Sequence, residues 1–316
     1  MNHKTESDIK WGIISGSSAY FLWGLLPLYW KLIDHIPSEE VLAHRIIWSF
    51  VFMSIMIVLS RKHRSCMTEV KLMFKNKRLL TAIILASLFI ATNWYVYIWA
   101  VANDQVVQAS LGYYINPLIS VLLGVIFLKE KLTRLQTVSV ILALTAVMLL
   151  TISAGVFPFV SLGLAVSFGL YGLMKKVAAI GTMTGVAFES LLVLPIAVLF
   201  LFLQHGASSS VLYVHEPLSI VLLLGAGAVT AVPLLLFSAG ARRIPLSLIG
   251  FLQYIAPTIM LIIGVVLFKE PFTVTHIVSF SLIWIALIMF TYSRYRELKK
   301  SKVTEPEILL TERKAN

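Results

Sequence analysis

Charged residues are scarce in this chain of 316 residues. Asp, Glu, Lys and Arg make up only 13% of it, whereas a soluble domain carries roughly 25%. Apolar residues account for 59%, and the mean hydropathy is +0.89. Water-soluble packing could not bury so much apolar surface, whereas a lipid bilayer does not require it to be buried. The composition therefore predicts an integral membrane protein, with the lipid bilayer as its first partner.

The sequence also lacks the motifs of several chemistries. Its single cysteine, Cys66, excludes an internal disulfide and a cysteine metal cluster. There is no His-Glu-x-x-His metalloprotease motif and no Gly-rich phosphate loop ending in Lys-Ser/Thr, so ATP-driven transport is disfavoured. No aspartate lies within an apolar run. We therefore expect no enzyme activity, no cofactor and no metal; a polytopic membrane enzyme or a non-transporting receptor or structural protein remains the alternative.

Long apolar runs dominate the chain instead. Each is close to the roughly 20 residues that a helix needs to cross a bilayer. The links between most of them are short, which implies antiparallel neighbours. The ten predicted spans cover residues 11–31, 40–60, 79–102, 106–128, 133–151, 157–178, 184–204, 218–240, 245–268 and 273–293. The sequence thus predicts an all-α protein with ten transmembrane helices.

Basic residues alternate between the predicted loops. Of 26 Lys and Arg residues, 23 fall on the side of the termini; Lys31 and Lys269 fall on the other, and Arg45 lies inside the second span. The positive-inside rule then predicts a multi-pass protein of the plasma (inner) membrane with both termini in the cytoplasm. The basic segment 61–78 is expected to be a loop that fixes topology rather than a lipid or nucleic-acid patch. The charged tail 297–316 is expected to be cytoplasmic and disordered.

Two segments of the chain are copies of each other. Residues 108–140 recur at 248–280, so that Tyr114, Pro117 and Glu130 correspond to Tyr254, Pro257 and Glu270. Weaker matches relate spans 1 and 2 to spans 6 and 7. Spans 1–5 (1–151) and 6–10 (152–296) therefore form two repeats. Because five is odd, the repeats cross the membrane in opposite senses, an inverted architecture typical of secondary transporters.

The sequence resembles a known family through motifs that run along nearly the whole chain. They are AYFLWGLLPLYWK (19–31), EVLAHRIIWS (40–49), NWYVYIWAV (93–101), QASLGYYINPL (108–118), SFGLYGLMKK (167–176) and GFLQYIAPT (250–258). They are similar to the RarD-type permeases, or chloramphenicol-sensitivity proteins, in the EamA branch of the drug/metabolite transporter superfamily. The resemblance implies a ten-helix transporter with a central cavity and a permease or exporter role. It implies no particular substrate.

Ionisable residues inside spans are costly and often functional. Glu40 and His44 share a helical face, and Arg45 lies one step round. The three could bind an anionic or zwitterionic solute or relay a proton, or they could anchor the helix at the interface. Glu189 follows an uncharged entry and precedes an apolar run, so it is a candidate for proton coupling. Alternatively, it pairs with Lys175 or Lys176.

Aromatic and amide side chains supply the rest of a plausible cavity. An apolar lining with a few polar groups suits a small amphipathic organic solute. Trp11, Trp30 and Trp99 are better explained as interfacial belt residues. The further candidates for solute binding are Tyr20, Trp23, Asn93, Trp94, Tyr97, Tyr113, Tyr114, Asn116, Tyr171, Gln253 and Tyr254.

The repeated prolines Pro117 and Pro257 each remove a backbone hydrogen bond, which predicts a hinge or binding site at matching places in both repeats. Together these features predict a secondary active transporter that moves small organic metabolites or drug-like solutes by alternating access. Because Glu189 and Glu40 place carboxylates within spans, this transport is expected to be coupled to protons. The sequence specifies neither the substrate nor the direction of transport nor the oligomeric state.

Overall fold

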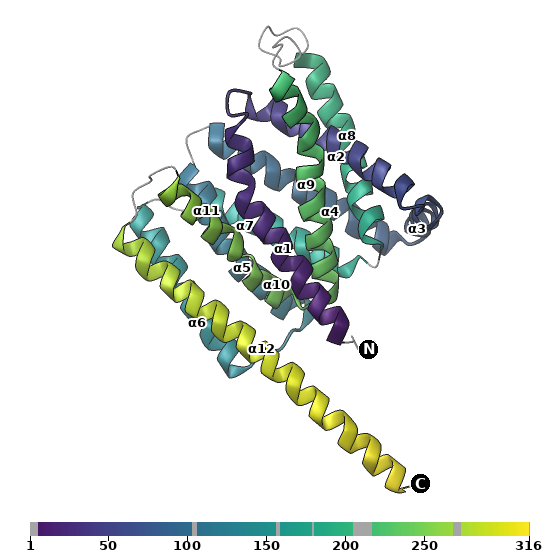
Figure 1. Cartoon of the computed structure of the whole chain (residues 1–316), viewed down its shortest axis with the longest axis vertical. Helices are drawn as coiled ribbons and strands as arrows, with labels where there is room; N and C mark the ends of the chain where they lie inside the picture. The colour runs from purple at the N-terminus through teal and green to yellow at the C-terminus, as the bar shows by residue number, and fades with distance from the viewer. Residues whose placement is uncertain are drawn as a thin grey trace.

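The computed structural model describes residues 6–102, 106–155, 159–178, 180–204, 217–267 and 273–315, and in these ranges every regular element is helical (Figure 1). The helices are α1 (Glu6–Lys31), α2 (Ser38–Leu59), α3 (His63–Lys75), α4 (Lys77–Ala102), α5 (Val106–Leu128), α6 (Arg134–Ala154), α7 (Phe159–Val177), α8 (Thr182–Gln204), α9 (Pro217–Arg243), α10 (Leu246–Leu252), α11 (Ile255–Val266) and α12 (Val274–Ala315). The all-α prediction is confirmed.

Most of these helices are built to lie in lipid. Within the described residues, nine candidate spans are long and apolar enough to cross a membrane. The tenth predicted crossing is α1, whose 26 residues extend about 39 Å and pack against α9 and α11. Large apolar side chains such as Leu59 and Phe202 lie exposed on the outside of the bundle. The protein is therefore a multi-pass membrane protein.

The contacts between the helices follow a symmetric pattern. The first set of five crossings is α1, α2, α4, α5 and α6, and the second is α7, α8, α9, α10–α11 and α12. The main contacts between the sets have counterparts. α1 packs on α9 as α4 packs on α7, and α5 packs on α7 as α1 packs on α11. The last crossings of the two sets, α6 and α12, lie side by side at one edge (Figure 1). Five crossings per set make the sets run in opposite senses, as the repeat predicts.

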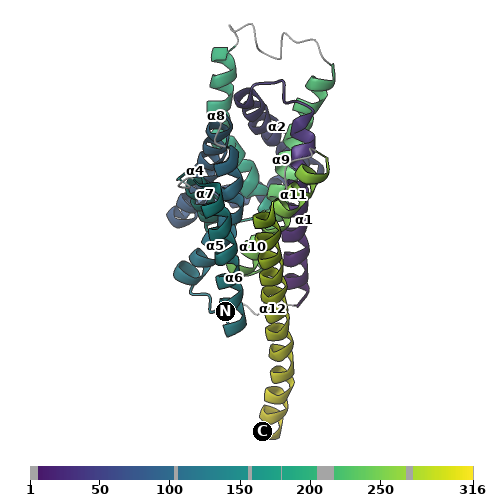
Figure 2. The ribbon, with the colours of Figure 1, turned by 90° about the vertical axis from the view of Figure 1, so that its left-hand side faces the viewer.

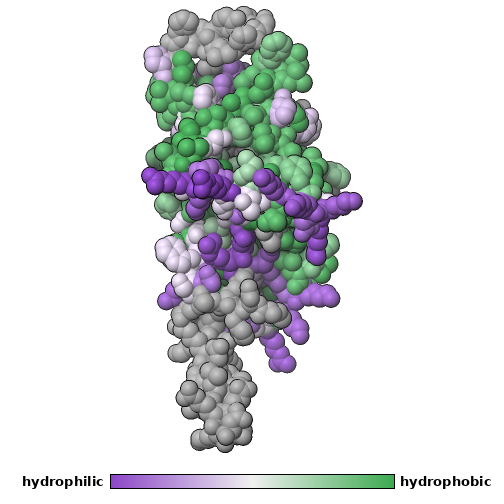
Figure 3. All heavy atoms as spheres, turned by 90° about the vertical axis from the view of Figure 1, so that its right-hand side faces the viewer, coloured by the Kyte–Doolittle hydropathy of each residue, from purple (hydrophilic) through white to green (hydrophobic). Residues whose placement is uncertain are grey.

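The two chain termini lie at the same end of the bundle (Figure 2). We call this the basic end; it comprises the start of α1, α3, the turn 129–133 and the start of α10. Hydrophilic residues gather on the face of the molecule that carries α3, while apolar residues cover the surface beyond it (Figure 3). The other end of the bundle is called the opposite end.

The predicted loop 61–78 is not a loop, and this expectation was wrong. It contains α3, whose Met73 is buried against Ile83 and Ile180. Arg64 and Lys71, seven residues apart, lie on another face of the same helix. The amphipathic period was hidden by the high density of basic residues. Similarly, α12 continues as helix to Ala315, which differs from the disordered tail expected for 297–316.

The span predicted at 245–268 is interrupted between α10 and α11. Pro257 has no N–H to donate to the Gln253 carbonyl, which instead accepts from the Ala256 N–H at 3.2 Å. Just before this break, α10 crosses α5 closely: a Cβ added to Gly250 would lie 2.9 Å from the Pro117 carbonyl oxygen. The matching helix α5 stays continuous through Pro117. A hinge role for the two prolines remains a prediction.

Candidate functional site

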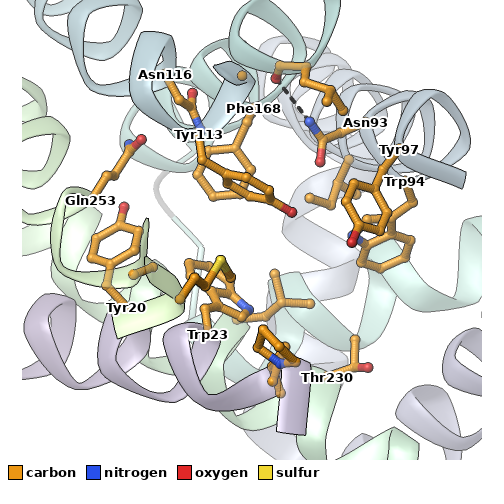
Figure 4. A pocket seen from close by; sticks show the side chains of 18 of the residues that line it. Tyr20, Trp23, Asn93, Trp94, Tyr97, Tyr113, Asn116, Phe168, Thr230 and Gln253 are labelled. Atoms are coloured by element: carbon orange, nitrogen blue, oxygen red, sulfur yellow. Dashed lines mark hydrogen bonds between the residues drawn. The ribbon is translucent and has the colours of Figure 1, made fainter. Parts of the chain in front are cut away.

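A cavity of about 240 Å³ lies between helices of both repeats. Most of its residues come from the second halves of α1 and α4 and the first halves of α5 and α7, which places most of the cavity in the half of the bundle away from the basic end. The lining comprises Tyr20, Trp23, Leu26, Pro27, Trp30, Arg45, Ile90, Asn93, Trp94, Tyr97, Gly112, Tyr113, Asn116, Leu164, Phe168, Thr230, Leu234, Gln253, Ala256 and Met260. Figure 4 shows aromatic rings and amides from several helices pointing into this space.

Many of the residues predicted from the sequence meet here. They are Tyr20, Trp23, Arg45, Asn93, Trp94, Tyr97, Tyr113, Asn116 and Gln253. All of them except Gln253 come from helices of the first repeat, namely α1, α2, α4 and α5. Their role in solute binding remains a prediction.

Other predicted residues lie outside this lining. Tyr114 packs edge-on against Phe280 at 5.4 Å between ring centroids, and thereby joins α5 to α12. Tyr254 is buried at the α10–α11 break. His44 accepts a hydrogen bond from Trp48 Nε1 at 3.3 Å, and its Nε2 lies 4.0 Å from Glu40 Oε1.

Their positions follow from helical geometry. Adjacent positions on a helix point about 100° apart. His44 and Arg45, neighbours in the chain, therefore face different surroundings, and only Arg45 reaches the cavity. The spacing that grouped Glu40 with His44 correctly placed these two side chains together, but not in the cavity.

Among the described residues that line this cavity, Arg45 is the one that carries a charge. Its guanidinium carbon lies 4.8 Å from the centroid of the Trp30 ring and 5.5 Å from that of Trp94. Its Nε donates to Thr230 Oγ1 at 3.2 Å. The aromatic faces stabilise the cation without neutralising it. The expectation that Trp30 is only a belt residue was wrong.

Sequence reasoning also missed Phe168 and Thr230 as lining residues. Phe168 had a signal, because it stands in the second repeat where Tyr20 stands in the first. Thr230 had none, since a single hydroxyl within a long apolar run is ordinary in a membrane helix. Only the approach of α9 to α2 gives that hydroxyl its contact with Arg45.

The amides of the cavity are partly satisfied by the protein. Asn93 Nδ2 donates to the Leu164 carbonyl at 2.9 Å and to Ser167 Oγ at 3.1 Å. Gln253 Nε2 donates to Ser120 Oγ at 2.9 Å, which connects the break in the second repeat to α5. These bonds fix the side chains in place. The Oε1 atom of Gln253 takes no part in them and has no hydrogen-bond partner among the described residues.

An aromatic layer closes the cavity toward the basic end. Trp23, Phe168 and Phe237 form its centre, with ring centroids 5.3 to 5.8 Å apart. Tyr171 stacks on Phe237 at 5.6 Å with an interplanar angle of 18°. Such contacts combine apolar burial with favourable ring geometry. Tyr171, a predicted binding residue, thus lies on the far side of this layer from the solute space.

Beyond the aromatic layer lies a buried ion pair. Lys175 Nζ is 2.6 Å from Glu189 Oε1, and the two side chains are only 3% and 5% exposed. Tyr171 donates its hydroxyl to Glu189 Oε2 at 3.2 Å. Of the two interpretations that the sequence allowed for Glu189, the pairing with Lys175 is the contact that the structure contains. Glu189 therefore lies between the cavity and the basic end rather than in the cavity.

Two further contacts strengthen this closure. Lys176 donates to the carbonyl oxygens of Ala241 and Ile244, and so joins α7 to the end of α9. Glu130 accepts from the N–H groups of Leu246 at 2.7 Å and Ser247 at 3.0 Å at the start of α10. A carboxylate suits these N–H groups and the positive end of the helix dipole. Its repeat counterpart, Glu270, lies outside the described residues.

In the described ranges, no group of three His, Cys, Asp or Glu side chains is placed to hold a metal ion.

Comparison with known proteins agrees with this architecture. The model of the EamA-like transporter family matches residues 10–152 and 157–292. The chain is 46% identical to the uncharacterized transporter YojE of Bacillus subtilis, covering 94% of this chain and 99% of that protein. It is 39% identical to the protein RarD of Escherichia coli, covering 92% and 97%. A solved crystal structure shares the fold with a TM-score of 0.69 at 18% identity, over 90% of this chain and 98% of the other. The chain therefore belongs to the EamA-like transporter family, as a relative of the RarD proteins.

Proposed function

We propose that this protein is a secondary active transporter that moves a small organic solute across the plasma membrane by alternating access. The observation that carries the proposal is the cavity, to which both inverted repeats contribute residues. Toward the basic end, it is closed by contacts between side chains. A ligand held between two such repeats can be exposed to either side when the repeats rock against each other. Membership of a transporter family supports the same conclusion.

We further propose that the basic end faces the cytoplasm. The 23-to-2 distribution of Lys and Arg between the loops supports this orientation. The cavity then belongs to an outward-facing conformation, since most of its residues lie in the half of the bundle away from the basic end. Transport to the other side requires the aromatic layer and the ion pair behind it to separate.

Glu189 is the proposed site of proton coupling. Its ion pair with Lys175 holds α7 to α8 on the cytoplasmic side of the cavity. Protonation of the carboxylate would remove the attraction and leave the lysine ammonium buried without a counter-charge, which is strongly unfavourable. Opening toward water would relieve that cost. Protonation would thus favour the inward-facing conformation.

The test is solute flux in proteoliposomes with and without a pH gradient. An enzyme would show turnover in detergent, where no gradient exists; a transporter shows gradient-dependent accumulation. Thr230→Trp, which would fill the cavity, should abolish flux. Ile196→Trp, at a residue exposed on the outer surface of the bundle, is the control and should not. Flux that survives Thr230→Trp would contradict transport through this cavity.

Coupling is tested separately. Glu189→Gln should abolish gradient-driven accumulation but preserve exchange of labelled for unlabelled solute, because the amide keeps the shape and cannot release a proton. Unchanged accumulation in this variant would remove Glu189 from the coupling mechanism while leaving the transport proposal intact.

A further inference from the structure

The cavity has two chemically different ends joined by an apolar middle. In Figure 4, Asn116, Gln253 and Tyr20 lie on one side, and Trp94, Tyr97 and Thr230 lie on the other. Arg45 belongs to the side of Trp94 and Thr230 through its contacts with them, and this side is called the first end. The side of Asn116, Gln253 and Tyr20 is called the second end. A ligand that fills the cavity must satisfy both ends at once.

At the first end, the guanidinium of Arg45 lacks a counter-ion. Within the described residues no carboxylate pairs with it, and no acidic side chain lines the cavity. Trp30 and Trp94 interact with the cation, and one of its five N–H donors is taken by Thr230. The planar fork of a guanidinium matches the two oxygens of a carboxylate. This end therefore favours an anionic group and repels a cation.

At the second end, three buried polar atoms have no hydrogen-bond partner among the described residues. They are Tyr20 Oη, Asn116 Oδ1 and Gln253 Oε1, on side chains that are 3%, 8% and 4% exposed. The Tyr20 hydroxyl has a single proton and can serve only one of the two amide oxygens. The other oxygen still needs a donor, because an unsatisfied buried acceptor costs roughly 1–3 kcal/mol. A ligand with a hydroxyl or N–H group would supply it.

Between the two ends, aromatic and aliphatic side chains leave room for a flat apolar body. Trp23, Tyr113 and Phe168 contribute rings to this part of the lining, with Leu164 and Leu234 beside them. Rings of this kind stack on planar ligands. Apolar walls with a few placed polar groups are typical of sites for small organic molecules.

We infer that the solute is a small organic monoanion that has a carboxylate, a flat apolar body and a hydrogen-bond donor at the far end. The carboxylate binds Arg45, the body lies among Trp23, Tyr113 and Phe168, and the donor reaches Asn116 or Gln253. This inference rests on the proposed function, since it names the solute class of that transport cavity. It excludes lipophilic cations as preferred solutes.

Four compounds that share one ring test the inference on the purified protein. They are 4-hydroxyphenylacetate (anion with donor), phenylacetate (anion without donor), tyramine (cation with donor) and tyrosine (zwitterion). Binding is read from the concentration dependence of the thermal unfolding midpoint, since a ligand that binds only the folded state raises it. We expect 4-hydroxyphenylacetate to bind tightest, phenylacetate and tyrosine more weakly, and tyramine not at all.

Variants identify the groups responsible. Arg45→Gln should weaken binding of 4-hydroxyphenylacetate by about tenfold or more, as expected for a charge-assisted hydrogen bond. Arg45→Lys should weaken it less, because the charge stays and the fork is lost. Arg64→Gln, at an exposed residue of α3, is the matched control and should have no effect. Asn116→Ala should reduce the difference in binding affinity between 4-hydroxyphenylacetate and phenylacetate, because the hydroxyl loses an acceptor.

Several outcomes would overturn the inference: stabilisation by tyramine, none by either carboxylate, or carboxylate binding that is unchanged in Arg45→Gln. Flux measurements distinguish a failure of this inference from a failure of the proposed transport function. Cation flux that Thr230→Trp abolishes would preserve the transporter and refute the monoanion. Binding of the carboxylate by a protein that transports nothing would preserve the ligand class and refute transport.

Discussion

The buried pair of Lys175 and Glu189 has a natural control in the same chain. Lys31 Nζ and Asp34 Oδ2 are also 2.6 Å apart, but these side chains are 63% and 55% exposed, against 3% and 5% for the buried pair. The two pairs therefore have the same contact distance in different surroundings. Glu189→Gln and Asp34→Asn make the same chemical change in each, an amide for a carboxylate, so their comparison isolates the effect of burial.

Glu189→Gln should destabilise the protein by about 3 kcal/mol or more, because removing one member of a buried pair leaves the other charge uncompensated. The double variant Lys175→Met/Glu189→Gln should recover most of that loss, since an apolar side chain needs no counter-charge. Asp34→Asn should leave the unfolding midpoint unchanged, since water screens the exposed pair. The measurement is thermal unfolding of purified protein in detergent at neutral pH.

The comparison is made at neutral pH, where the exposed Asp34 is ionised. The hydrogen bond and charge of Lys31 lower the pKa of Asp34 below its ordinary value. The carboxylate is therefore ionised at neutral pH in the folded and the unfolded chain alike, and any contribution to stability is lost only on acidification through the lowered pKa. If Glu189→Gln unfolded at the wild-type temperature, or if the double variant were less stable than the single one, the buried charge argument would be refuted.

Three other expectations follow from the structure. Cys66, in α3 at the basic end, should react with an impermeant thiol reagent only after cells are permeabilised; labelling of intact cells would reverse the proposed orientation. Gly240→Ala should lower the unfolding midpoint, because its Cβ would lie 3.0 Å from the backbone nitrogen of Gly16, and a wild-type midpoint would show that α1 and α9 can separate at no cost. Glu130→Ala should destabilise the protein by about 2 kcal/mol through the lost hydrogen bonds to the start of α10, measured by the same unfolding assay; no change would mean that water replaces the carboxylate.

The spans and their inverted repeat could be predicted from the sequence because both are local or periodic properties. A bilayer demands about 20 apolar residues wherever a helix crosses it, so the runs are visible without any tertiary information. The repeat is visible because Tyr114 and Pro117 recur as Tyr254 and Pro257 at a constant shift. The break in the second copy was less predictable, since Pro117 leaves α5 continuous while Pro257 follows an interruption.

The candidate site could be predicted only in its residue types. Polar and aromatic side chains inside spans pointed to a cavity, and Arg45, Asn93 and Gln253 do line one. Two other candidates from the sequence lie outside this lining: His44 contacts Trp48 within its own helix α2, and Tyr114 contacts Phe280 of α12. A helix presents all its faces in turn, and the sequence does not say which face meets lipid, a neighbouring helix or the cavity when every face is apolar enough for the membrane.

The sequence by itself determined that this protein crosses a membrane in two inverted sets of helices, because apolar length and duplication are written along the chain. Only the tertiary structure decided which charges meet. It paired Glu189 with Lys175 across α7 and α8, and it left Arg45 between two tryptophans without a carboxylate partner in the described residues. Both outcomes depend on contacts a few ångströms long between separate helices. Such contacts are set by how the helices cross, which no single segment specifies.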